Sequence, residues 1–200
     1  DGFAQIVAED YAPRLDEIGR EYLQRIRVAT QRMARLIDDL IDLARLTRQS
    51  MRRETVNLSQ LVEQILGELH QEEPDRQVET SVEPGLTAAA DRALIRVALD
   101  NLLRNAWKFT SRRELARIRF HAEMRDRQIV YCVSDNGAGF DMSFASKLFL
   151  PFHRLHGISE FAGTGIGLAT VQRVIQRHEG QVWAMSAPDE GASFFFTLSH

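Results

Sequence analysis

Apolar residues in the first fifty positions recur with the spacing of a long amphipathic helix. From Tyr22 they alternate in steps of four and three, a heptad seam made of Tyr22, Ile26, Ala29, Met33, Leu36, Leu40 and Leu43. Other apolar residues widen the seam into a stripe: Leu23, Ile37, Ile41 and Ala44. A stripe of this width suits a four-helix bundle better than a two-stranded coil. The pattern predicts a helix over about residues 18–48, roughly 45 Å long.

A shorter apolar group precedes this helix. Phe3, Ile6 and Val7 indicate the end of another helix, which stops before Pro13 because the residue preceding a proline is disfavoured in the helical region. Together the two helices make a hairpin over residues 1–50, which is half of a four-helix bundle. A second copy of the chain would supply the other half, so we expect a homodimer. Packing of the helix within one chain is the alternative.

Residues 51–200 alternate between strand and helix patterns and form a second expected domain, after a linker near 49–54. Helices are expected to begin near residues 58, 91 and 166. The expected strands are 55–57, 76–82, 87–90, 116–124, 128–134, 181–186 and 192–198. All but the first are expected in one mixed sheet covered on one face by the three helices, an α/β sandwich, so the chain is of the α+β class. Its expected core aromatics are Trp183, Phe194, Phe195 and Phe196.

Three short segments carry polar residues with related chemistry. The first, NLLRNAWKFT at 101–110, places Asn101, Asn105 and Lys108 on one helix face beside the apolar stripe. Mg²⁺ takes oxygen ligands, so an amide carbonyl and phosphate oxygens can complete its shell, and Lys108 adds a cation for phosphates. Taken alone, a solvated polar helix face is the simpler interpretation.

The second segment, DNGAGF at 135–140, follows two expected strands. A carboxylate at Asp135 can accept a hydrogen bond from the adenine amine and would repel the guanine carbonyl oxygen. Gly137 and Gly139 allow a tight turn and the close approach of a flat ring. A plain Asp-Asn-Gly turn is the alternative.

The third segment, GTGIGL at 163–168, opens a helix whose free N–H groups and dipole attract phosphate. It lacks the preceding strand and the later acidic residue of a dinucleotide-binding fold, and the chain has no GxxxxGK[ST] phosphate loop. Together the three segments predict an ATP pocket.

Composition narrows the partners. With 44% apolar residues in 200, the chain can bury a real core, and a net charge of −3 gives no general attraction to nucleic acid or membranes. The single Cys132 lies in an expected strand, so we expect a buried, inert thiol and no internal disulfide. No signal peptide or membrane-spanning run is apparent, and we expect a cytoplasmic location.

The chain resembles the catalytic domain of sensor histidine kinases, which belongs to a wider group that includes gyrase, the ninety-kilodalton heat-shock chaperones and MutL. The resemblance rests on the order of four segments: the asparagine segment, DNGAGF, FLPFHRLH at 149–156 and GTGIGL. The match covers residues 53–199, and the stretch 152–184 further resembles phytochrome-type kinases. Residues 1–50 resemble the dimerisation and histidine-phosphotransfer domain through RMARLIDDLIDLARL.

The resemblance implies ATP and Mg²⁺ as cofactors, with Asn105 ligating the metal, Lys108 and Arg154 contacting phosphates, and Asp135 binding the adenine amine. It implies a lid over residues 141–162, anchored by Phe149 and Phe152. The other residues expected to line the nucleotide are Asn101, Gly137, Gly139, Phe152, Gly163, Thr164, Gly165, Gly167 and Leu168.

Asn101 favours transfer over hydrolysis. In hydrolytic members of this group the position four residues before the magnesium asparagine is a glutamate that activates water, and an amide cannot act as a base. The resemblance therefore implies a kinase that phosphorylates a histidine and then an aspartate on a response-regulator receiver domain. None of the six histidines here fits the acceptor motif, so we expect the acceptor upstream of this chain. A silent dimeric scaffold and an ATP hydrolase are the alternatives.

Overall fold

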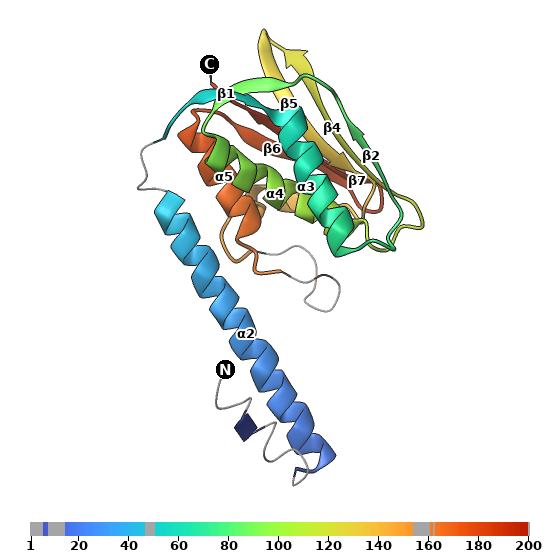
Figure 1. Ribbon diagram of the computed structural model, residues 1–200. Coiled ribbons are helices and arrows are strands. Elements are labelled where there is room, and N and C mark those ends of the chain that lie inside the picture. The colour runs from blue at the N-terminus through green and yellow to red at the C-terminus, as the bar shows by residue number, and fades with distance from the viewer. Residues whose placement is uncertain (1–5, 8–14, 47–50, 154–160, 162, 200) are drawn as a thin grey trace. The chain divides into compact units, whose positions relative to one another are not determined.

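The computed structural model describes residues 6–7, 15–46, 51–153, 161 and 163–199. It divides into two compact units, Asp1–Thr47 and Arg48–His200, which we describe separately (Figure 1). The expected α+β class is confirmed: helices come first, and a sheet covered by helices follows.

The first unit contains one long helix, α2, over Glu17–Leu46. Asp16 precedes it, and its carboxylate accepts a hydrogen bond from the Gly19 amide (2.7 Å), as an N-terminal cap does. Tyr22, Ile26 and Met33 of the heptad seam are 59%, 55% and 56% exposed, so the described structure leaves this part of the seam uncovered. Of the expected preceding helix, Ile6 and Val7 are described, and both are helical.

The second unit is built on a five-stranded sheet in the order β2-β4-β5-β7-β6. Its strands are β2 (Val78–Val82), β4 (Ala116–Arg125), β5 (Gln128–Asp135), β6 (Val182–Ala187) and β7 (Gly191–Thr197). The β2 strand runs parallel to β4, and the other neighbours are antiparallel. Burial alternates along β4, as expected for a strand with one face on a core.

One expected strand lies elsewhere. Residues 87–90 were expected in the main sheet, but β3 (Thr87–Ala90) pairs with β1 (Glu54–Asn57) in a separate two-stranded sheet. The chain turns away from the end of β2 at Gly85, which has a φ of +78°. Ser59 holds both sides of this turn, because its hydroxyl donates to the Glu83 carbonyl (2.6 Å) and accepts from the Leu86 amide (3.0 Å).

Three helices cover one face of the sheet: α3 (Leu58–Glu72), α4 (Arg92–Phe109) and α5 (Gly167–Arg177) (Figure 1). Asn57 caps α3 by accepting from the Gln60 amide, and Asp91 caps α4 by accepting from the Ala93 and Leu94 amides. The largest fully buried side chains lie mainly between these helices and the sheet: Leu58, Leu61, Ile65, Ile95, Leu99, Leu102, Leu103, Ile118, Phe120, Ile166, Ile175 and Phe196.

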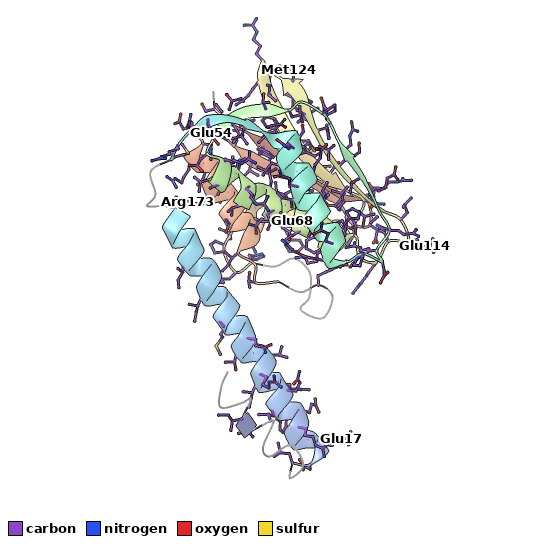
Figure 2. The ribbon with its side chains drawn as sticks, in the orientation of Figure 1. Glu17, Glu54, Glu68, Glu114, Met124 and Arg173 are labelled. Carbon is purple, nitrogen blue, oxygen red and sulfur yellow. The ribbon has the colours of Figure 1, made fainter. Side chains whose placement is uncertain are left out.

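The opposite face of the sheet carries a second apolar cluster. Val130, Cys132 and Phe195 are buried there, with Trp183 stacked on Phe195 at 5.6 Å between ring centroids. Phe194 and Phe196, on either side of Phe195 in β7, face the helices, so the expected core aromatics divide between two faces. Burial raises the pKa of Cys132 to about 12, as expected for an inert thiol. Met124, 68% exposed, projects from the end of β4 (Figure 2).

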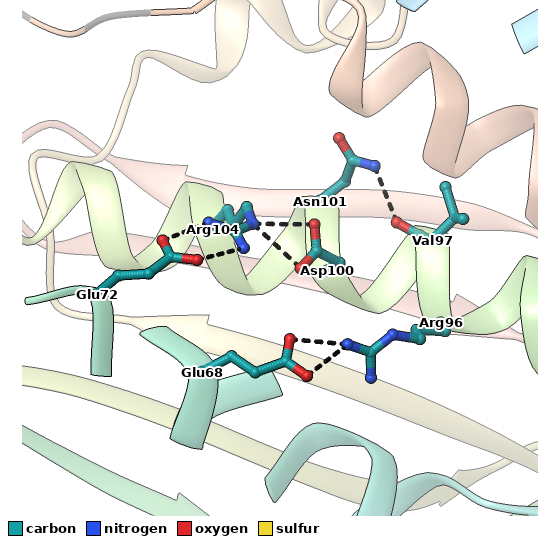
Figure 3. A network of polar contacts seen from close by, with 7 residues as sticks. All are labelled: Glu68, Glu72, Arg96, Val97, Asp100, Asn101 and Arg104. Atoms are coloured by element: carbon teal, nitrogen blue, oxygen red, sulfur yellow. Dashed lines mark hydrogen bonds and ion pairs between the residues drawn. The ribbon is translucent and has the colours of Figure 1, made fainter. Parts of the chain in front are cut away.

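Ion pairs join α3 to α4 on the solvent side. The Arg104 guanidinium forms two parallel hydrogen bonds with Glu72 (2.9 and 3.0 Å) and also binds Asp100, while Arg96 binds Glu68 (2.7 Å) (Figure 3). The hydrogen bonds and charge of Arg104 lower the pKa of Glu72, despite its exposure. These pairs help to fix how α4 lies against α3, and α4 carries the first of the three polar segments.

Candidate functional site

The polar residues of α4 lie on one side of the helix, as their spacing predicts. The Lys108 ammonium donates to the Asn105 side-chain oxygen (3.2 Å) and lies over the Phe109 ring. The Asn101 amide donates to the Val97 carbonyl (2.8 Å) and points away from Glu68 and Glu72 (Figure 3). The helix therefore presents two amides and a cation on a face separate from the ion pairs with α3.

The third polar segment runs along this face of α4 in the opposite direction. A Cβ at Gly167 would lie 2.5 Å from the Asn101 side-chain oxygen, and one at Gly163 would lie 3.4 Å from the Lys108 nitrogen. Phe161 continues the series by packing edge-on against Phe109, with 4.9 Å between ring centroids. Residues 101, 108 and 109 thus lie next to residues 167, 163 and 161, so the two segments run antiparallel. The first and third segments are therefore brought together.

The start of α5 is suited to an anion. The N-cap residue Ile166 makes no side-chain capping hydrogen bond, so no cap side chain occupies the first amides of α5, where the positive end of the helix dipole also lies. Gly165 adopts a φ of +81°, and its carbonyl accepts a hydrogen bond from the Phe152 amide (3.0 Å). Thr164 and Leu168 are partly buried on either side of this turn. Phosphate oxygens would find N–H donors here and the Lys108 cation nearby.

Asp135 ends β5, opposite Ile118 of β4, and its carboxyl group lies beside the C-terminal end of α4. The Gly137 amide donates to its Oδ1 atom (2.8 Å). Burial raises the pKa of Asp135 to about 6, while hydrogen bonds from the Gly137 and Ala192 amides and the positive charge of Arg113 act in the opposite direction. At neutral pH the group is a carboxylate and an acceptor.

The two glycines after Asp135 are required by the packing of the protein itself. A Cβ at Gly137 would lie 2.6 Å from the Phe109 carbonyl oxygen, which also accepts a hydrogen bond from the Ala138 amide (3.1 Å). Gly139 has a φ of +62°, and a Cβ there would overlap the Ala187 carbonyl oxygen. These contacts hold the loop against both α4 and the β6–β7 turn. They explain the glycines without a ligand.

The segment between the second and third polar segments differs in part from expectation. Its described portion includes the short 3₁₀ helix η2 (Met142–Lys147). Phe149 is half-buried, but Phe152 is 54% exposed and has a φ of +65°, so the expectation that Phe152 anchors this segment is wrong. The buried apolar residues here are Leu148 and Phe161 instead. Arg154, expected to bind phosphate, lies outside the described residues.

Two residues that the sequence did not single out hold the elements of the site in place, Arg113 near Asp135 and His178 at the far end of α5. Arg113 donates to three backbone carbonyls in the loops around Asp135. His178, at the end of α5, accepts from the Asp91 amide through Nε2 (3.0 Å) and donates from Nδ1 to the Val174 carbonyl (2.8 Å), so it is a buried, neutral, structural histidine. The only sequence signal for Arg113 is its place in the charged run RREL after α4.

The side chains at the site determine which kind of metal ion it could bind. Within the described ranges there is no group of three or more histidine, cysteine or acidic side chains that could bind a metal by itself. The Asn105 oxygen is one suitable ligand, and Mg²⁺ commonly takes few protein ligands and completes its shell with phosphate and water. The site therefore fits a metal that arrives with phosphate groups.

Comparisons with known proteins agree in both units. Residues 90–200 match the family model for histidine kinase-, DNA gyrase B- and HSP90-like ATPases, and residues 1–49 match that for the His Kinase A (phospho-acceptor) domain. The phytochrome-like protein Cph1 of Synechocystis is 30% identical over 98% of this chain and 26% of its own length. The sensor protein kinase WalK of Staphylococcus saprophyticus is 28% identical over 91% and 31%.

The fold is shared with solved structures. Full-length ShkA, crystallised in complex with AMPPNP, superposes with a TM-score of 0.68 at 24% identity, over 98% of this chain and 41% of its own. The chain spans about a quarter to a third of the length of the curated relatives above. In the part of the chain that the structure describes, no helix is long and apolar enough to cross a membrane.

Proposed function

Because the chain belongs to the family of histidine kinase-, DNA gyrase B- and HSP90-like ATPases, we propose that it binds Mg-ATP and donates the γ-phosphoryl group in a two-component sensor kinase. The predicted resemblance to sensor histidine kinases, including phytochrome-like ones, is confirmed by its relatives. One observation carries the proposal: the glycine segment runs along the polar face of α4, and the Asp135 carboxylate lies at the end of that helix.

Each end of a nucleotide has a counterpart in this arrangement. Asp135 accepts from the adenine amine, and Asn105 gives one oxygen to Mg²⁺. Lys108 and the amides at the start of α5 hold phosphate oxygens, assisted by Thr164 and by Arg154. Bound Mg²⁺ would balance the charge that develops on the phosphates. Residues 141–162 are proposed as the lid, and Asn101, Gly163, Gly165, Gly167 and Leu168 as the floor of the pocket.

The proposed reaction is transfer rather than hydrolysis. Asn101 is an amide held by the Val97 carbonyl, and it cannot take a proton from water. The acceptor is a neutral histidine imidazole, which attacks the γ-phosphorus as the bond to the β-γ bridging oxygen breaks and ADP leaves. Residues 1–49 match the phospho-acceptor domain but contain no histidine, so we propose that another part of the protein supplies it.

The partners follow from the same assignment. A homodimer through α2 would cover the exposed seam at Tyr22, Ile26 and Met33, and a response-regulator receiver domain would take the phosphoryl group from the histidine. Because the reaction consumes ATP, we place this part of the protein in the cytoplasm.

Labelling of the full-length protein with γ-labelled ATP tests the proposal. A base-stable, acid-labile phosphoprotein is expected, and it should be lost in Asp135→Asn and Asn105→Ala together with ATP binding. Unchanged ATP affinity in both variants would contradict the site. Nucleotide binding without any labelled protein would instead support a silent scaffold, and continuous phosphate release would support a hydrolase.

A further inference from the structure

Arg113 is the inward residue of an otherwise exposed charged run between α4 and β4. Its neighbours Arg112 and Glu114 are exposed, and Glu114 projects away from the domain (Figure 2), whereas Arg113 is half-buried. Its Nε atom donates to the Asn136 carbonyl (2.7 Å), and Nη2 donates to the Gly137 carbonyl (2.9 Å) and to the Asp189 carbonyl. One guanidinium thus joins the loop after β5 to the β6–β7 turn.

The loop after β5 is also joined to the segment between α4 and β4 in the reverse direction. The Asn136 side chain donates to the Leu115 carbonyl (3.0 Å) and accepts from the Arg117 amide (2.7 Å). Arg113 therefore reaches from the 110–116 loop to the 136–137 backbone, while Asn136 reaches back from that backbone to the 115–117 segment. Together with the Phe109–Ala138 hydrogen bond, these contacts hold the loop beside Asp135 against α4 and the start of β4.

Arg113 also acts on Asp135 through its charge. Burial raises the pKa of Asp135, and Arg113 is the one charged side chain among the described residues that lowers it. Its positive charge therefore favours the ionised carboxylate. The Gly137 and Ala192 amides act in the same direction as Arg113. Arginine keeps its charge at all accessible pH values, so this influence is constant.

We propose that Arg113 is a positioning residue of the nucleotide site, which fixes the 135–137 loop and keeps Asp135 a hydrogen-bond acceptor, and so sets the preference for adenine over guanine. This inference rests on the proposed function. A carboxylate accepts from the adenine amine and repels the guanine carbonyl oxygen, whereas a protonated carboxyl group can donate to that oxygen. Protonation of Asp135 should therefore reduce the preference for ATP over GTP.

The test is the ratio of ATP to GTP affinity, measured by equilibrium binding to the 200-residue chain between about pH 5 and 8. The two nucleotides share the same triphosphate, so its own titration cancels in the ratio. The unaltered chain should prefer ATP, with the preference falling as pH drops through about 6. In Arg113→Gln the fall should begin at higher pH, and the ratio at about pH 7 should drop about two- to threefold, because Arg113 is the smallest of the causes that lower the pKa of Asp135 and a change of about 0.3–0.5 in pKa alters the proportion of the two forms by that factor.

Two further variants separate charge from position. Arg113→Lys keeps the charge but cannot reach three carbonyls, so it should weaken both nucleotides and retain the ratio. Arg119→Gln, which removes an exposed arginine on β4, is the matched control and should change neither. If Arg113→Gln does not fold, Arg113→Lys decides alone, and wild-type affinity for both nucleotides in that variant would overturn the proposal.

The failures of the two proposals are distinguishable. If the chain binds neither nucleotide, or if Asp135→Asn keeps full ATP affinity, the nucleotide site itself is wrong. If Asp135→Asn loses ATP while Arg113→Gln keeps both the ratio and its pH midpoint, the role of Arg113 alone is wrong.

Discussion

Gly167 and Asn101 lie close together between the two helices that carry the site. The space that a Cβ would occupy at Gly167 is taken by the Asn101 side-chain oxygen, at 2.5 Å, and Asn101 is held there by its bond to Val97. Asn101 can therefore keep its position only while residue 167 has no side chain. The glycine contributes to the site through packing as well as through its place at the start of α5.

Two glycine-to-alanine changes should have opposite effects on stability. Gly67 lies exposed within α3 with nothing inside 4 Å of a Cβ, so Gly67→Ala should raise the unfolding free energy by about 0.5–1 kcal/mol through its helix propensity. Gly167→Ala should lower it by about 0.5–1 kcal/mol, the cost of displacing the Asn101 side chain from its hydrogen bond to Val97. Urea unfolding measures both.

Adding Asn101→Ala to Gly167→Ala should restore most of that loss, because the overlapping oxygen is removed. Additive losses in the double variant would show that the two residues do not interact, and would contradict the packing described above.

The sequence predicted residues that one helix brings together and missed those that depend on distant segments. Asn101, Asn105 and Lys108 share a face because helical spacing alone places them there. Arg113 has partners 23 to 76 positions away, and no local pattern carries that information. The resemblance to sensor histidine kinases implies that Phe152 is an anchor, but burial depends on the course of the backbone, which turns at this residue.

At the level of elements, α4 and α5 are joined at both ends of their contact. Near the site Asn101 meets Gly167, and at the remote end His178 accepts from the amide of Asp91, the residue that caps α4. Asp91 also accepts from the Arg52 amide, and Arg53 pairs with Glu179 (2.9 Å). The first described residues of the second unit are therefore tied to the ends of both helices.

Removal of His178 should loosen this junction. His178→Ala leaves the Asp91 amide without its acceptor and opens a cavity, so the unfolding free energy at about pH 7.5 should fall by about 2–3 kcal/mol. Burial lowers the pKa of His178 and outweighs the hydrogen bond to the Val174 carbonyl, which raises it; the charges of Arg53 and Arg177 lower this pKa further, and that of Asp91 raises it. Its stabilising contribution is therefore complete above the ordinary pKa of 6.5 and is lost as pH falls below it.

Denaturant unfolding measures this effect. The difference in unfolding free energy between wild type and His178→Ala should become smaller as the pH is lowered below 6.5. A difference that stays constant or widens would mean that His178 is not held neutral by its partners.

Strand positions were predictable from alternation, but the pairing of one strand was not. The expected strands at 116–124, 128–134 and 192–198 correspond to β4, β5 and β7, whose buried and exposed residues alternate or form apolar runs. The pairing of β3 with β1 depends on Ser59, which binds both sides of the turn after β2. A hydroxyl in a helix gives no sign in the sequence that it directs a turn more than twenty residues later.

For the whole molecule, the exposed side of α2 is the main surface that the fold leaves unexplained. A soluble helix normally buries its apolar stripe, yet Tyr22, Ile26 and Met33 remain more than half exposed. The match of residues 1–49 to the phospho-acceptor domain and the heptad spacing both favour burial against a second copy of the chain. In that case dimerisation and nucleotide binding use separate surfaces of the chain.

Charge placed on the seam should therefore separate the subunits without weakening nucleotide binding. Ile26→Lys combined with Met33→Lys should convert a dimer to a monomer at micromolar concentration, measured by sedimentation equilibrium, because buried lysines at the seam cannot be solvated. Val28→Lys is the matched control: Val28 is an apolar residue, 52% exposed, on the side of α2 away from the seam, and should leave the dimer intact. ATP affinity per chain should be the same in all three proteins, since every residue assigned to the nucleotide lies in the second unit. If the wild-type chain is a monomer, the proposal that the seam forms a dimer interface is wrong. If Val28→Lys alone dissociates the dimer, the interface lies on a different face of α2.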